Sequence, residues 1–190
     1  MASAVWGTNR LQALLLALML TLSCAAVQAA PASHIEQELG AARLAGQGTF
    51  RWFGIALYDA ALWVGARGYR TGAPEAAPFV LDLRYARALD GQKIAEASFD
   101  EIEKLGIGTH AQRVAWLARM RAIFPDVKQG SHLSGVYLPG AGARFYLDGK
   151  VLAEVDDPAF ARAFFAIWLD PGTSAASLRM ALLMNAAPRQ

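Results

Sequence analysis

The sequence predicts an α+β fold in which helices pack on a mainly antiparallel sheet. One observation is the order of the expected elements, which is strands, two helices, strands and two helices. Another is that the strand and helix units of a parallel, Rossmann-type sheet do not alternate along the chain. The composition agrees, because 190 residues with 55% apolar and 18% charged residues suit one globular domain with a sizeable core.

Strand patterns dominate the first half of the expected domain. After a short helical or irregular segment at Ile35 to Leu44, residues 46–65 read GQGTFRWFGIALYDAALWVG and predict a β-hairpin or a long bent strand. Residues 65–78 contain three glycines and two prolines, which indicate a loop. Apolar residues alternate again from Phe79 to Arg87 and predict a third strand.

Two consecutive helices follow these strands. Asp90 is a suitable N-cap for a helix that runs to Leu105, with Gly106 as its stop. Its expected inward face consists of Ile94, Ala97, Ser98, Ile102 and Leu105. Thr109 and Gln112 have the spacing of a capping box, and they predict a second helix that ends at Pro125.

The C-terminal half repeats this order of strands and helices. Strands are expected at His132 to Leu138, Ala143 to Leu147 and Val151 to Val155, and the pair Asp148-Gly149 is a strong signal for a two-residue hairpin turn. Asp157 followed by Pro158 predicts the start of an apolar helix. A last helix is expected to begin near Ser174.

The N-terminus has the pattern of a secretory signal. Arg10 precedes an apolar run from Leu11 to Leu22, and the small residues that follow favour cleavage after Ala29. The run is short for a membrane-spanning helix, which needs about 20 residues. We therefore expect a signal peptide at residues 1–29, an N-terminal segment at 30–45 and one domain at 46–186, in the periplasm or outside the cell. An uncleaved anchor and lipidation of Cys24 remain alternatives.

Intact-mass analysis after expression in a secreting bacterial host is expected to show a chain that begins near Ala30, because signal peptidase cleaves after small residues. Such a chain has no cysteine, since Cys24 is the only one, and it needs no disulfide in an oxidising compartment. A product that keeps Met1, or that carries diacylglycerol on Cys24, would contradict the prediction of a soluble exported protein.

Several kinds of chemistry are disfavoured by the sequence. The formal charge of +2 is too small for a phosphate-binding surface, so a nucleic-acid partner is not expected. No metal or other cofactor is expected, because the three histidines, His34, His110 and His132, lie in different elements without a ligand motif. Gly140 and Gly142 indicate a turn, and no nucleophile elbow of a serine hydrolase is present.

The order of several motifs resembles the bacterial, exported branch of the chalcone isomerase-like family. These motifs are a Gly-x-Gly-x-x-Arg segment ending at Arg51, a strand ending in Tyr-x-Ala-Ala-Leu, Tyr137-Leu138-Pro139-Gly140, Asp148-Gly149-Lys150, and residues 165–170. The resemblance covers Gly46 to Leu183. It implies an open-faced β-sandwich, a large antiparallel sheet whose concave side is covered by helices around a ligand cleft. The family includes chalcone isomerases, fatty-acid-binding proteins and members without known activity, so the fold alone does not select a function.

The positions that match the catalytic residues of the enzymes do not keep them. Where the family's isomerases carry a Thr, a Tyr, an Asn and a late Thr or Ser, the resemblance places Phe53, Asp90, Ala97 and Ile167. We therefore expect a non-catalytic protein that binds a small apolar acid such as a fatty acid. Alternatives are an isomerase of the chalcone type, which is an intramolecular lyase, and an envelope scaffold without a small ligand.

Arg51 is the one catalytic-site residue that the resemblance retains. A guanidinium stays charged in proteins, so an inward Arg51 needs an anionic partner, and a bound carboxylate would provide one. The predicted ligand-binding residues are Arg51, Phe53, Ile55, Leu57 and Trp168. The alternative is that Arg51 faces solvent at the end of a strand, or pairs with Asp59 or Asp82.

Overall fold

The computed structural model describes residues 30–188. The predicted signal peptide, residues 1–29, lies outside the described residues. Six strands form one antiparallel sheet in the order of the sequence. They are β1 (Arg43–Trp52), β2 (Ile55–Val64), β3 (Phe79–Tyr85), β4 (His132–Leu138), β5 (Gly142–Leu147) and β6 (Lys150–Val155). The predicted α+β fold with a large antiparallel sheet is confirmed.

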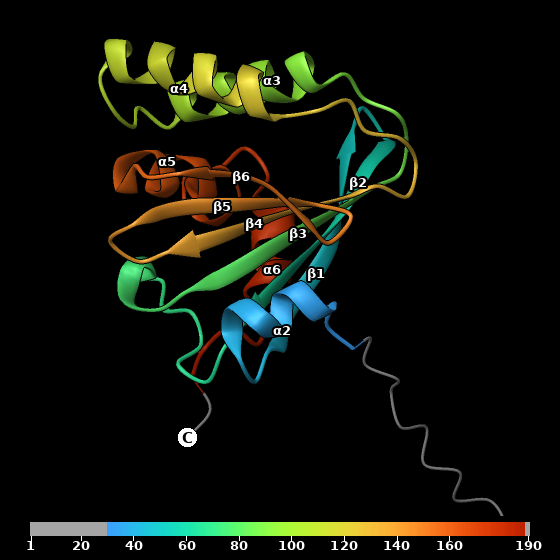
Figure 1. Ribbon diagram of the computed structural model, residues 1–190, viewed down its shortest axis with the longest axis vertical. Helices are drawn as coiled ribbons and strands as arrows, with labels where there is room; N and C mark the ends of the chain where they lie inside the picture. The colour runs from blue at the N-terminus through green and yellow to red at the C-terminus, as the bar shows by residue number, and fades with distance from the viewer. Residues whose placement is uncertain (1–29, 189–190) are drawn as a thin grey trace, which may run out of the picture. The chain divides into compact units, whose positions relative to one another are not determined.

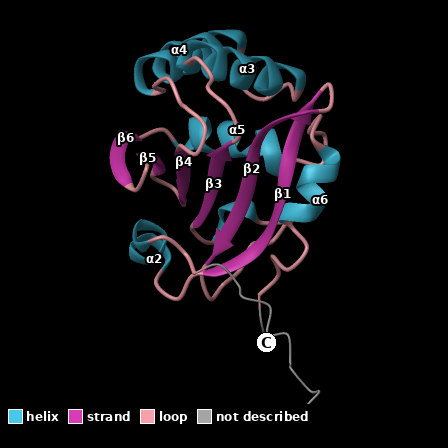
Figure 2. Ribbon diagram, turned by 90° about the vertical axis from the view of Figure 1, so that its right-hand side faces the viewer, coloured by secondary structure: helices cyan, strands magenta, loops and turns pink. Residues whose placement is uncertain are grey.

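Helices cover both faces of this sheet (Figure 1). On the inner face, α5 (Pro158–Leu169) packs on β4 and β5, and α6 (Ala176–Leu182) packs on β1 and β2. The antiparallel pair α3 (Gly91–Lys104) and α4 (His110–Ile123) forms a further layer, in which α3 packs on α5. The short helix α2 (Ser33–Leu39) lies on the outer face, seen at the lower left of Figure 2.

The helix ends follow the capping signals of the sequence. The Asp90 side chain accepts from the backbone N–H groups of Gln92 and Lys93, and Thr109 and Gln112 form both bonds of a capping box. The Asp157 carboxylate caps α5 by accepting from the N–H groups of Ala159 and Phe160. Since each signal involves neighbours in sequence, these helix starts depend on local contacts.

The β1–β2 hairpin decides between two expectations. The predicted β-hairpin is confirmed, and the long bent strand, which would place Arg51, Phe53 and Ile55 on the same side of one extended chain, is wrong. In the structure, Phe53 and Gly54 form a two-residue turn with φ values of 46° and 79°, and Ile55 begins the antiparallel return strand. Both central residues of such a turn lie in the left-handed region, as in a type I′ hairpin. The period of two therefore does not continue across the turn.

The core lies mainly between the inner face of the sheet and α5. It contains an aromatic cluster of Phe79, Phe124, Tyr137, Phe145, Phe160, Phe164, Phe165 and Trp168. A smaller cluster on the outer face joins Ile35 of α2 to Trp63, Val80, Val136 and Tyr146. The inner cluster positions the candidate site described next.

Candidate functional site

A small apolar cavity lies between the sheet and α5. Its volume is about 10 Å³, and its lining has no exposed polar surface. The lining residues are Leu81, Leu83, Leu133, Gly135, Phe145, Phe164, Phe165 and Trp168. This volume is close to the minimum for one water molecule, and an apolar cavity of this kind stays dry. In this state of the protein, the aromatic rings of α5 therefore fill most of the space beneath the helix.

Two tyrosines, Tyr58 and Tyr85, lie next to Trp168 on the β2 side of the cavity, just outside its lining. Trp168 Nε1 donates to the Tyr58 hydroxyl at 3.0 Å, and Tyr58 pairs across the sheet with Tyr85, with their ring centroids 5.8 Å apart. Among the described residues, no group accepts the proton of either hydroxyl in a hydrogen bond. Both hydroxyl protons are thus available to a ligand that carries a hydrogen-bond acceptor.

Burial strengthens the preference of both tyrosines for the neutral form. It raises the pKa of Tyr58 well above its ordinary value, against the effect of the Trp168 hydrogen bond, and the Glu101 carboxylate raises it further. Burial also raises the pKa of Tyr85, with a smaller contribution from Tyr58. At physiological pH, this end of the site therefore offers two neutral donors beside a negative charge.

The negative charge beside the two tyrosines is the carboxylate of Glu101 of α3, whose side chain is only 10% exposed. Its Oε1 accepts from the Ser174 N–H at 2.8 Å, and its Oε2 accepts from the Ser174 hydroxyl at 2.7 Å. Lys104 Nζ lies 3.6 Å from Oε2, but the lysine side chain is largely exposed, so it screens the charge only in part. Glu101 thus ties α3 to the segment between α5 and α6.

A second polar contact ties α4 to the start of α5. Trp116 Nε1 donates to Asp157 Oδ2 at 2.9 Å, and the Trp116 ring contacts that of Phe160. Burial alone would raise the pKa of Asp157, but hydrogen bonds from Phe160, Trp116 and Ala159 outweigh it and lower the pKa. The ionised carboxylate therefore serves both as a helix cap and as an acceptor for the layer above.

The α3–α4 layer, residues 86–131, leaves the sheet after β3 and returns to it before β4. At its base, Leu89 and Val127 form an antiparallel bridge with N···O distances of 3.0 and 2.9 Å. The layer is attached by this narrow two-stranded stem, by the polar contacts of Glu101 and Trp116, and by buried apolar side chains that include Met120 and Phe124. Movement of the layer relative to α5 would break few backbone hydrogen bonds, but it would separate these side chains from the core.

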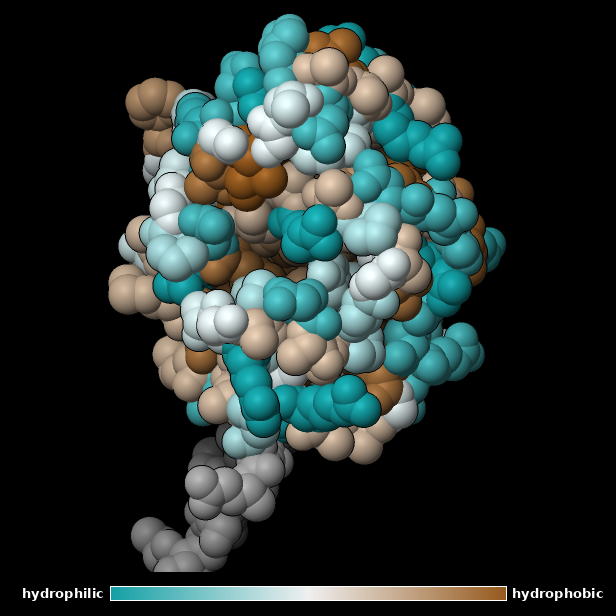
Figure 3. Space-filling model, turned by 90° about the vertical axis from the view of Figure 1, so that its left-hand side faces the viewer, coloured by the Kyte–Doolittle hydropathy of each residue, from teal (hydrophilic) through white to brown (hydrophobic). Residues whose placement is uncertain are grey.

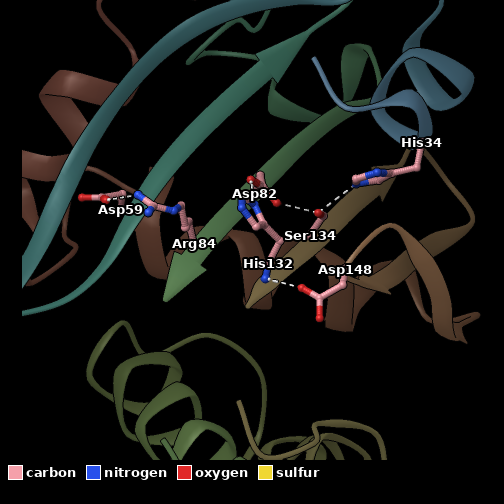
Figure 4. Close-up of polar contacts among 7 residues, drawn as sticks. All are labelled: His34, Asp59, Asp82, Arg84, His132, Ser134 and Asp148. Carbon is pink, nitrogen blue, oxygen red and sulfur yellow. Dashed lines mark hydrogen bonds and ion pairs between the residues drawn. The ribbon is translucent and has the colours of Figure 1, made fainter. Parts of the chain in front are cut away.

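The outer face carries a buried polar network that the sequence did not reveal (Figure 4). Ser134 donates to Asp82 Oδ1 at 2.6 Å, His34 Nε2 lies 2.9 Å from the Ser134 hydroxyl, and His132 Nδ1 lies 2.8 Å from Asp82 Oδ2. Burial lowers the pKa of His34 despite the opposite effect of Asp82. Ser134 is fully buried. The network thus anchors α2 to β3 and β4 rather than presenting a nucleophile to a substrate.

A larger hollow of about 250 Å³ lies at the loop between β2 and β3. Small residues and backbone form much of its lining, and its two arginines, Arg67 and Arg70, are exposed. Its lining is partly polar, so the apolar cavity beneath α5 is the better candidate for the site of an apolar ligand. The face opposite to that of Figure 2 is mainly hydrophilic with separate apolar patches (Figure 3).

The predicted ligand-binding residues do not come together. Trp168 lines the cavity and is 5% exposed, and Leu57 is half-buried in β2. Arg51, Phe53 and Ile55 lie at the end of the hairpin, where Phe53 is 89% exposed and Arg51 Nη1 donates to the Gly54 carbonyl at 3.2 Å. Asp59, a predicted partner of Arg51, instead pairs with Arg84 at 3.6 Å. The wall expected around Arg51 is absent because the turn separates these side chains from the core.

The positions matched to the isomerase residues are also dispersed. Phe53 is in the exposed turn, Asp90 caps α3, Ala97 is exposed on α3, and Ile167 is buried in α5. These four positions therefore form no common site. Within residues 30–188, no cluster of three or more His, Cys, Asp or Glu side chains could hold a metal ion. No helix in this part of the chain is long and apolar enough to cross a bilayer.

Comparisons with known proteins agree with this architecture. A crystal structure of a fatty-acid binding protein of Arabidopsis thaliana is similar, with a TM-score of 0.62 over 77% of this chain and 88% of that chain, at 15% identity. This likeness shows the fold. An uncharacterized protein of Haemophilus influenzae is 33% identical over 106 residues, which are 56% of this chain and 52% of that protein. The chain thus spans about half of that relative. The sequence pattern of the chalcone isomerase-like family matches residues 25–184, and the chain belongs to this family.

Proposed function

We propose that this protein binds an apolar, lipid-like ligand such as a fatty acid between the sheet and α5. The observation that carries the proposal is a small apolar cavity next to a pair of tyrosines, Tyr58 and Tyr85, whose hydroxyl protons have no acceptor among the described residues. The fatty-acid binding function of the Arabidopsis protein of the same fold supports it. We also propose that the chain is exported, on the basis of the signal pattern at residues 1–29.

Binding requires the closed cavity to expand. Ligand sites for small molecules measure about 300–1,000 Å³, far more than the present volume. The side chains that must move are Phe164 and Trp168, which project from α5 into the cavity. The α3–α4 layer covers α5 from above, so its displacement would free the helix to shift. A ligand chain would then occupy the space that these two rings fill in the closed state.

The polar end of the site selects an uncharged head group. Tyr58 and Tyr85 are donors without positive charge, and Glu101 lies near enough to Tyr58 to raise its pKa. An ionised carboxylate placed there would be repelled by Glu101 and poorly solvated. A protonated carboxylic acid or an alcohol can accept the two hydroxyl protons without this cost. The ligand is therefore a fatty acid bound in its neutral form, or a related neutral lipid.

The preference for a neutral head group can be tested with two matched probes, dodecanoic acid and dodecanol. The affinity of the protein for each probe is measured by calorimetric titration at several pH values from about 5 to 8. The apparent affinity for the acid is expected to fall about tenfold per pH unit above the pKa of its carboxyl group, since only the protonated fraction binds. The affinity for the alcohol is expected to stay constant, because dodecanol does not titrate in this range and both tyrosines stay protonated throughout it.

Tyr85→Phe is expected to lower the affinity for both probes by roughly fivefold, which is the effect of one lost hydrogen bond. Tyr69→Phe is the matched control, because Tyr69 is a buried tyrosine of the β2–β3 loop whose ring packs on Phe79 rather than on Tyr58. Tighter binding of the acid at high pH would show that the head group is a carboxylate. If the protein binds neither probe, the proposed ligand site is wrong, and the envelope scaffold becomes the favoured function.

A further inference from the structure

The end of the β1–β2 hairpin exposes an apolar group that the ligand site does not use. Trp52, Phe53 and Ile55 are 57%, 89% and 53% exposed, and the Trp52 and Phe53 rings contact each other edge to face at 5.1 Å. The hairpin extends beside the α3–α4 layer in both views (Figures 1 and 2). We call Arg51 to Ile55 the hairpin tip.

Phe53 is an unusual residue for this turn, and the chain contains its own comparison. The β5–β6 hairpin has the same turn at Asp148-Gly149, with φ values of 49° and 79°, against 46° and 79° at Phe53-Gly54. Asp148 suits the left-handed conformation, and its carboxylate accepts from the His132 N–H at 2.8 Å. Phe53 has the same strained backbone without such a bond and exposes almost its whole ring. Neither local conformation nor core packing explains a phenylalanine there.

The charges around the tip are basic. Arg51 is exposed within it, and Arg87 is exposed just beyond Ala86, whose N–H donates to the Leu57 carbonyl of β2 at 2.9 Å. The only acidic residue of the two hairpin strands is Asp59, which accepts from Thr49 at 2.7 Å and pairs with Arg84. A protruding Trp-Phe pair flanked by arginines matches the interface of an anionic bilayer, where aromatic rings sit among head groups and phosphates attract the cations.

We propose that the hairpin tip docks the protein on the surface of a bilayer that contains anionic phospholipid, with Trp52 and Phe53 inserted at the level of the head groups. This docking does not depend on ligand binding in the interior cavity. It would place the protein at a membrane surface, while the described residues remain outside the hydrocarbon core.

The test uses the full chain, as recovered from the cell, with vesicles of equimolar phosphatidylcholine and phosphatidylglycerol that carry bromine near the head-group end of their acyl chains. Tryptophan quenching is measured for the wild type and for Trp52→Phe, and the difference reports Trp52 alone. This difference is used because the apolar run at residues 11–22 could bind vesicles by itself in an unprocessed chain. Substantial quenching of Trp52 is expected, and it should be weaker with brominated phosphatidylcholine alone.

Phe53→Asn separates docking from folding. Asparagine favours the left-handed conformation, so the thermal midpoint should stay the same or rise, while about tenfold more lipid should be needed for half-maximal Trp52 quenching. Val151→Thr is the control, because Val151 is an apolar residue of β6 that is 62% exposed, and it should leave quenching unchanged. No quenching of Trp52, equal quenching by neutral vesicles, or wild-type quenching in Phe53→Asn would overturn the proposal.

Discussion

Phe164→Ala is expected to lower the free energy of unfolding by about 3–5 kcal/mol, the range for deleting a buried aromatic side chain. The Phe164 ring lines the cavity and contacts the rings of Phe124, Phe145, Phe160, Phe165 and Trp168 at centroid distances of 5.1–5.8 Å. Its removal therefore costs both burial and packing in the centre of the aromatic cluster. Urea unfolding monitored by circular dichroism measures the loss.

The same variant is expected to bind dodecanol more tightly than the wild type, because its enlarged cavity no longer requires a ring to move. Saturating ligand should return part of the lost stability, about 2.7 kcal/mol at a concentration of 100 times the dissociation constant. Phe160→Ala is the control, since Phe160 is a fully buried ring on the same helix that does not line the cavity. If dodecanol stabilises both variants equally, it would be filling any cavity created in the core, and the cavity beneath α5 would not be a specific ligand site.

The local structure was predictable where single residues have strong positional preferences. The starts of α3, α4 and α5 depend on Asp90, the Thr109 and Gln112 pair, and Asp157 with Pro158, and each acts on its own first turn. The turn at Asp148-Gly149 has the same basis. The inward face of α3 was less certain, because neighbouring positions differ by only about 100° around a helix. The structure buries Ala95 fully and exposes Ala97, a residue of the expected inward face.

The position of the β1–β2 turn could not be predicted from the sequence, because one of its two central residues is not a residue that usually forms turns. Phenylalanine rarely takes a left-handed conformation, so Phe53-Gly54 resembled the middle of a strand. A shift in register between Phe50 and Arg51 also changes which side chains lie opposite each other. The prediction that Arg51 binds a ligand depended on this reading of the strand. The alternative, in which Arg51 faces solvent at a strand end, describes its position in the structure.

The candidate site could not be assembled from the sequence, because its members meet only through the sheet register and helix packing. Tyr58 and Tyr85 are partners across β2 and β3, and Trp168 reaches Tyr58 from α5. Of these three residues, only Trp168 is among the ligand-binding residues that the sequence predicts. The network of His34, Asp82, His132 and Ser134 has the same long-range origin. The family resemblance gave the fold, which the family match confirms, but it did not locate these contacts.

Asp157→Ala is expected to lower the free energy of unfolding by roughly 2–4 kcal/mol, combining the loss of a helix N-cap with an unpaired, buried indole N–H on Trp116. Since hydrogen bonds lower the pKa of Asp157 in the folded state, its contribution is present above the unfolded pKa and is lost as the pH falls through the folded value. Unfolding measured at neutral pH therefore reports the full effect.

The two functions of Asp157 can be separated. Asp157→Ser keeps a capping oxygen but is too short to reach Trp116, and Trp116→Phe removes the indole N–H while the cap stays intact. Both variants should loosen the α3–α4 layer and speed the exchange of dodecanol, measured by stopped-flow displacement, while α5 keeps its helical content. If the layer is the cover of the site, these two variants should accelerate exchange to a similar extent. Exchange at the wild-type rate in both would show that the ligand reaches the cavity by another route.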